Sequence, residues 1–131
     1  MKVTDLTTIF LADGEKNIRE ALSLILAHRA DFVVVGEAST TESLLAQVCQ
    51  NPPEAILLDW SLPGFHPQRL LTALRQCCPE TIIMVTSVQP EQENLAVKFG
   101  FDGFLLKQLL PDEFLDSLKT AIHVNSNPLR K

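Results

Sequence analysis

Four short apolar runs, each broken off by a polar residue, constrain the fold of this chain more than any other feature. The runs have the length of buried β-strands, and the polar residue marks the point where a strand emerges into a loop. They are residues 9–12 before Asp13, 55–58 before Asp59, 82–85 before Thr86 and 104–106 before Lys107. A largely β-branched run, residues 32–35, ends at Gly36. It adds a fifth strand to the prediction.

Segments with helical spacing of apolar residues follow each of these strands. We expect helices to begin near Glu15, after the capping-box sequence of residues 39–42, before Leu70, at Pro90 and at Pro111. Their expected buried positions are Ile18, Ala21, Leu22, Ile25 and Leu26; Leu44, Leu45, Val48 and Cys49; Leu70, Leu71, Leu74 and one of Cys77 or Cys78; Leu95, Ala96 and Phe99; and Phe114, Leu115, Leu118, Ala121 and Ile122. The fourth helix, which Gly100 should cap, has the thinnest apolar face, so we expect it to move most easily.

Five strands that alternate with five helices predict an α/β fold, a single doubly wound parallel sheet with right-handed crossovers. The common open order for five strands is 2-1-3-4-5, whose switch point lies between the first and third strands. In that order Asp13 and Thr86 flank Asp59, and Lys107 lies on the edge strand beside Thr86. Residues almost a hundred positions apart should therefore meet at the carboxyl edge of one sheet.

These four side chains suit the transfer of a phosphoryl group. Two neighbouring carboxylates repel each other unless a cation or a proton lies between them. Mg²⁺ takes oxygen ligands, so Asp13, Asp59 and the backbone carbonyl of Ser61 are the expected metal ligands. With the metal bound, Asp59 would attack a phosphoryl group whose charged oxygens are taken by the metal, Thr86 and Lys107.

Length, charge and composition exclude several classes of protein. The 131 residues, 46% hydrophobic and 21% charged, fit one folded domain and not a disordered chain. A net charge of -5 argues against nucleic-acid binding by this segment, because phosphate backbones are held by clusters of Lys and Arg. The amino end lacks the pattern of a signal peptide, and no apolar run approaches the length of a membrane span. We therefore expect a protein partner and no membrane association.

The cysteines and histidines show no spacing typical of a redox or metal site. Three thiols, Cys49, Cys77 and Cys78, cannot all pair within the chain and contain no CxxC motif, which favours the cytoplasm. Neighbouring cysteines rarely reach disulfide geometry, so Cys77 and Cys78 are interpreted as a partly buried helix end and not as a redox pair. The three histidines are scattered and expected at the surface.

The same residues carry a resemblance to a known family. The sequences Leu57-Leu58-Asp59 with Leu62-Pro63-Gly64, Val85-Thr86-Ser87 and Gly103 to Lys107 resemble three signatures of the receiver domains of two-component response regulators. Val34 to Ala38 further resembles the subgroup whose receivers precede a helix-turn-helix DNA-binding domain. The resemblance implies a flavodoxin-like (βα)5 sheet, with a receiver domain over residues 1–124 and a tail or linker start over residues 125–131.

The resemblance also implies a role for each site residue. Asp59 would accept a phosphoryl group from a sensor histidine kinase or a phosphotransfer protein, and Thr86 and Lys107 would contact the acyl phosphate. Thr86 and Phe104 would then switch a protein-interaction surface, with homodimers left open. The chain would be a phosphoacceptor signalling domain in transcription regulation rather than a multi-turnover enzyme.

One position departs from the family pattern. Receivers place two adjacent acids after the first strand, where this chain has Asp13 and Gly14. By resemblance, the missing acid is the one that touches the metal directly, whereas Asp13 acts through water. Glu15 is close in sequence, but its side chain points elsewhere unless the loop bends. We therefore expect Mg²⁺ to bind weakly.

Two other functions stay open at this stage. A degenerate receiver, which docks or dimerises without phosphorylation, is favoured by Gly14. An enzyme or cofactor binder on a similar sheet ranks third, because Asp13 and Glu15 would repel a flavin phosphate. A dehalogenase-like phosphatase would need an aspartate at the position of Ser61.

Overall fold

Five parallel strands form one sheet in the order β2-β1-β3-β4-β5, as predicted. The computed structural model describes residues 6–125. The strands are β1 (Thr7–Ala12), β2 (Phe32–Ala38), β3 (Ala55–Asp59), β4 (Ile82–Ser87) and β5 (Gly103–Leu106), and every neighbouring pair is parallel. Because strand one lies between strands two and three, the chain reverses its winding direction there and leaves a switch point beside the end of β3.

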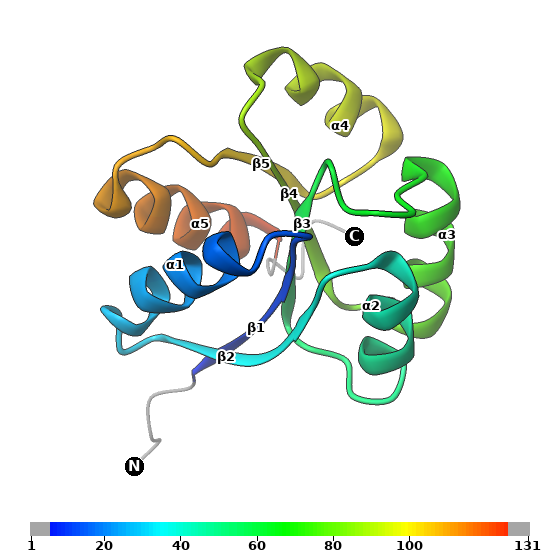
Figure 1. Cartoon of the computed structure of the whole chain (residues 1–131), viewed down its shortest axis with the longest axis horizontal. Coiled ribbons are helices and arrows are strands. Elements are labelled where there is room, and N and C mark those ends of the chain that lie inside the picture. Colours follow the sequence, from blue (N-terminus) through cyan, green and yellow to red (C-terminus); the bar gives the residue numbers. More distant parts are fainter. Residues whose placement is uncertain (1–5, 126–131) are drawn as a thin grey trace.

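Helices cover both faces of the sheet (Figure 1). One face carries α1 (Lys16–Ala27) and α5 (Pro111–Asn125), and the other carries α2 (Thr41–Val48), α3 (Pro67–Cys77) and α4 (Glu93–Phe99). A 3₁₀ turn, η1 (Pro90–Gln92), leads into α4. The cap of α2 lies one residue later than the capping-box sequence predicted, because the Thr40 hydroxyl, and not that of Ser39, accepts a hydrogen bond from a helix amide, that of Ser43 at 3.1 Å.

The side chains of β3 alternate between two hydrophobic cores. Ile56 and Leu58 belong to the core under α2, α3 and α4, whereas Ala55 and Leu57 belong to the core under α1 and α5. All four are at most 2% exposed. A strand buried on both faces needs a continuous apolar sequence, which is why this run was recognisable.

Several positions predicted to be buried are not. Within α4, described in full, only Ala96 is buried, whereas Leu95 is 44% and Phe99 is 38% exposed. The first residues of the expected helix form η1 instead, and the seven-residue helix that remains meets the sheet through one position. Cys49 and Ala21 are also exposed. The open choice between Cys77 and Cys78 resolves in favour of Cys78, which is 2% exposed.

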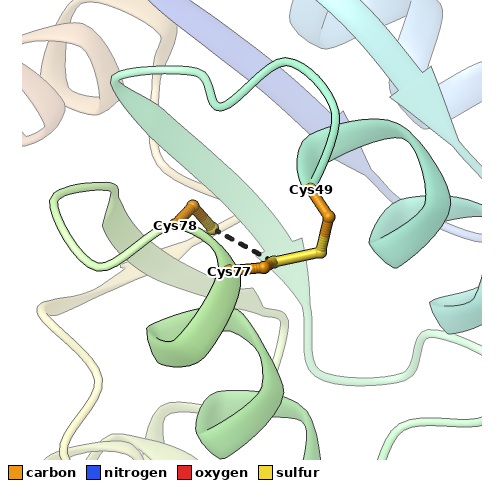
Figure 2. The surroundings of a disulfide bond; sticks show 3 residues. All are labelled: Cys49, Cys77 and Cys78. Atoms are coloured by element: carbon orange, nitrogen blue, oxygen red, sulfur yellow. Dashed lines mark hydrogen bonds between the residues drawn. A yellow bond between two sulfur atoms is a disulfide. The ribbon is translucent and has the colours of Figure 1, made fainter.

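A disulfide that the sequence analysis did not predict joins Cys49 to Cys77 (Figure 2). It explains why Cys49 does not pack inward, since its sulfur is turned toward the end of α3.

At the carboxyl end of the chain, α5 extends to Asn125, one residue past its expected end. Residues 126–131 of the predicted tail lie outside the described residues. Among residues 6–125, no helix combines the length and the apolar content that crossing a bilayer requires.

Gly100 ends α4 in the left-handed conformation, with φ of 98°, and its amide donates to the carbonyls of Ala96 and Val97. A Cβ added there would meet nothing closer than Leu71, at 3.7 Å, so an alanine has room and only its backbone is strained. We predict that Gly100→Ala lowers the free energy of unfolding by about 1 kcal/mol in urea denaturation. Gly100→Asn, which tolerates this conformation better, should lose less. Equal losses would contradict the explanation.

Candidate functional site

Two aspartates and a lysine meet at the carboxyl edge of the sheet. Lys107 Nζ lies 2.6 Å from Asp13 Oδ2 and 2.9 Å from Asp59 Oδ1, so one ammonium bridges both carboxylates. Asp13 is 2% and Asp59 is 6% exposed. The repulsion between two buried carboxylates is thereby offset by a cation of this chain. The predicted convergence of these three residues is present.

Backbone amides hold the two carboxylates in place. Asp13 Oδ1 accepts a hydrogen bond from the Glu15 amide at 2.9 Å, and Asp59 Oδ1 accepts one from the Ser61 amide at 3.1 Å. Each carboxylate therefore bonds to the amide two residues further along, which is the local turn that aspartate favours at the end of a strand. Arg19, which the sequence analysis missed, donates to the Asp13 carbonyl at 2.7 Å and pairs with Glu37. An arginine on the first turn of a helix next to an acidic loop was the available signal.

Lys107 is positioned by its own backbone at the end of β5. Its amide donates to the Ser87 carbonyl at 2.9 Å, which extends the pairing of β4 with β5 by one residue. Burial lowers the pKa of the ammonium, but the hydrogen bonds and charges of Asp13 and Asp59 outweigh burial and raise that pKa above its ordinary value of 10.5. Lys107 therefore stays charged across the physiological pH range.

Thr86 lies next to Asp59 in the sheet. The two residues are paired in the register of β3 with β4, and the Thr86 carbonyl accepts a hydrogen bond from the Trp60 amide at 2.9 Å. Thr86 is 1% exposed. Beside it, the Ser87 hydroxyl bonds to the Gln92 side chain, a contact that sequence reasoning missed because η1 was not foreseen.

The oxygen donors suit a hard cation but are one carboxylate short of the family pattern. Asp13 and Asp59 supply carboxylates, and Ser61 follows in an exposed loop, whereas Gly14 supplies no side chain. The Glu15 side chain is exposed. Among residues 6–125, no three acidic, histidine or cysteine side chains gather as a metal-binding group, and Glu15 does not join Asp13 and Asp59 in one.

Phe104, the expected switch aromatic, lies on β5 one residue from the pairing partner of Thr86. It is partly buried and packs against the core under α2, α3 and α4. Phe104 therefore packs on the face of the sheet that carries α4, and it belongs to the strand that leads to Lys107.

The strand order and the position of the acids define a class, the flavodoxin-like α/β domains with an acidic site at the switch point. Residues 9–119 match the sequence model of the response regulator receiver domain. The chain therefore belongs to that family and is the receiver domain of a two-component response regulator.

Similar proteins point to the same family. The nitrate/nitrite response regulator protein NarL of Escherichia coli K12 is 34% identical over 116 residues, which are 87% of this chain and 54% of that protein. The transcriptional regulatory protein YxjL of Bacillus subtilis is 27% identical over 119 residues, 89% of this chain and 55% of that protein. The signal receiver domain of NarL from Mycobacterium tuberculosis superposes with a TM-score of 0.81 at 24% identity, covering 91% of this chain and 98% of that one. The chain spans about half the length of the curated relatives.

The lysine bridge gives a pH-dependent prediction. Lys107→Met leaves two buried carboxylates without their cation, so we expect it to lower the free energy of unfolding by about 3 kcal/mol at pH 7. Because the folded pKa of Lys107 is raised, its contribution is complete below 10.5 and is lost only as the pH rises past the folded value. Past that value the neutral amine no longer offsets the two carboxylates, so the deficit of the variant should be constant near neutral pH and should shrink at alkaline pH.

The control is a second substitution at the same site. In Lys107→Met with Asp13→Asn only one carboxylate remains, so the repulsion is gone and part of the lost stability should return at pH 7. Urea denaturation at several pH values measures both proteins. A Lys107→Met protein as stable as the original at pH 7 would contradict the role of the bridge.

Proposed function

We propose that Asp59 is the phosphoacceptor of this receiver. The observation that carries the proposal is the Lys107 bridge, which fixes the Asp59 carboxylate at the end of β3 through Oδ1. Both the lysine and the Ser61 amide engage Oδ1, so Oδ2 is the oxygen that we expect to form the bond to phosphorus. A pre-oriented carboxylate beside a fixed positive charge meets the two main needs of phosphoryl transfer, which are positioning and charge stabilisation.

The residues around Asp59 suggest a division of tasks. The ammonium of Lys107 has three donors and two aspartate partners in the structure. Its third donor can therefore bond to a phosphoryl oxygen. Thr86, one strand away, is placed to bond a second oxygen. Receiver domains generally bind Mg²⁺ at the phosphorylation site. Asp13, Asp59 and the Ser61 carbonyl would hold the ion here, and the bound ion would neutralise charge on the incoming group.

Membership in the receiver family suggests both the donor of the phosphoryl group and the output of this domain. Receiver domains interact with histidine kinases or phosphotransfer proteins, so the phosphoryl group should come from the phosphohistidine of such a partner. Thr86 and Phe104 are proposed to pass the change to α4, which is held to the sheet through Ala96. A transcriptional output is proposed by analogy with the transcriptional regulatory protein YxjL, and a DNA-binding output domain, homodimer formation and a cytoplasmic location are proposed as what membership in the receiver family implies.

Gly14 favours a second candidate, a receiver that works as a docking module without phosphorylation. The comparisons give this alternative no support over the first. The two candidates differ in whether Asp59 is modified.

The test of the first candidate is direct phosphorylation. We expect acetyl phosphate with Mg²⁺ to add one phosphoryl group, seen by intact-mass spectrometry, and Asp59→Asn to abolish the addition because it removes the nucleophile. Asp13→Asn should slow the reaction but keep its site. If the original protein is not phosphorylated at saturating acetyl phosphate and Mg²⁺, while another receiver is phosphorylated in the same mixture, the docking module is favoured.

Because position 14 carries glycine where the family has an acid, we predict that an acid there raises the affinity for Mg²⁺. Gly14→Asp restores a second acid next to Asp13, so we expect Mg²⁺ to bind about tenfold more tightly, roughly 1.4 kcal/mol, in a titration of Trp60 fluorescence. A Cβ at this position lies 3.0 Å from the ring of Pro63, so the loop must shift slightly in any variant. Gly14→Asn has the same shape without the charge and controls for that shift. Equal affinity of the two variants would refute the charge argument.

A further inference from the structure

Three sulfur atoms meet at the edge of the sheet opposite the phosphoacceptor. Cys49 follows α2 and precedes β3, and Cys77 ends α3 and precedes β4, so their disulfide lies at the amino ends of the strands. Their Cα atoms are 5.1 Å apart, within the ordinary range for a disulfide. Cys78 is a free thiol whose sulfur lies 4.0 Å from that of Cys77 (Figure 2).

The three cysteine residues differ in their exposure to solvent. Cys49 is exposed, Cys77 is partly buried and Cys78 is 2% exposed. A thiolate displaces a sulfur from the side opposite the bond that breaks. For Cys77 that side is occupied by Cys78 (Figure 2), although both residues also line a cavity of about 490 Å³. Cys49, the exposed residue of the pair, is therefore the point at which we expect a small thiol to attack.

Cys78 is not suited to exchange with the disulfide. Burial raises the pKa of its thiol, which opposes the thiolate that exchange needs, although Thr81 and Arg75 act in the other direction. Adjacent Cα atoms are about 3.8 Å apart across a trans peptide, shorter than disulfides favour. Both observations argue against a disulfide between Cys77 and Cys78. Cys78 therefore offers a matched control.

We propose that Cys49 and Cys77 form a reversible thiol–disulfide pair, which opens and closes in the folded domain by exchange with a small thiol and its disulfide. On opening, a thiolate bonds to the sulfur of Cys49, the bond between Cys49 and Cys77 breaks, and Cys77 leaves as a thiolate that takes up a proton. A second thiolate then attacks the mixed disulfide, which releases Cys49 and one molecule of the small disulfide. The protein is reduced by two electrons and two small thiols are oxidised to one disulfide, and closing is the reverse.

The pair controls how firmly α2 is attached. This helix spans eight residues and buries only Leu44 and Val48, so a covalent link at its end is a large part of what holds it. The link spans a sequence separation of 28 that includes β3 with Asp59. Opening the disulfide frees that segment in the unfolded chain and releases the end of α2 in the folded one.

The test compares the full 131-residue chain in oxidised and reduced glutathione. We expect alkylation and mass spectrometry to find two more free thiols in reduced than in oxidised buffer, at millimolar glutathione and without denaturant. The melting temperature should fall by roughly 10 °C on reduction. Amide hydrogen exchange should rise in residues 41–48. Cys78→Ser should behave like the original protein, and Cys49→Ser should lose both the two-thiol difference and the shift in melting temperature.

Trapping experiments test which of the two sulfurs forms the mixed disulfide first. In Cys77→Ser, oxidised glutathione should attach to Cys49, and in Cys49→Ser its attachment to Cys77 should be slower by on the order of tenfold. A disulfide that stays closed in reduced glutathione until the protein is denatured would show a fixed structural link and overturn the proposal. So would equal responses of Cys49→Ser and the original protein, or a two-thiol change that needs Cys78. None of these outcomes bears on phosphorylation of Asp59.

Discussion

The bridge from one lysine to two aspartates is the interaction on which the functional edge of this domain depends. Asp13 and Asp59 leave adjacent strands as buried carboxylates, and the ammonium of Lys107 lies 2.6 and 2.9 Å from them. The fold can carry this concentration of charge because both acids are also bound by local amides. The same bridge joins β1, β3 and the end of β5, so the outer strand is held to the centre of the sheet by charge as well as by its ladder.

The opposite edge of the sheet has a different chemistry. There the ends of α2 and α3 are joined through Cys49 and Cys77, and Cys78 is enclosed beside them. One edge is polar and carries paired carboxylates and an ammonium, and the other is stabilised through sulfur. Since β3 runs from one to the other, a single buried strand connects the two.

The sheet and most of the site were predictable because they depend on local signals. Strands such as β3 and β4 are buried on both faces and therefore read as continuous apolar runs, and their order followed from the general rule for five parallel strands. Periodicity does not report whether an apolar face is covered, so Leu95 and Phe99 were placed inside although they are exposed. The Cys49 to Cys77 pair was missed because it depends on where two helices end in space. The direct contact of Lys107 with Asp13, 94 residues away, likewise needs coordinates.

The thin attachment of α4 has a consequence for the energy landscape of the domain. A seven-residue helix that buries Ala96 alone and begins with a 3₁₀ turn gains little from packing, so its amides should open in excursions far cheaper than global unfolding. Stability in this domain is therefore uneven, with a rigid centre formed by β3 and β4 and a labile rim at residues 90–99. We therefore expect conformers in which that rim is remodelled to be populated to a small extent in the resting protein, available to any event that favours them.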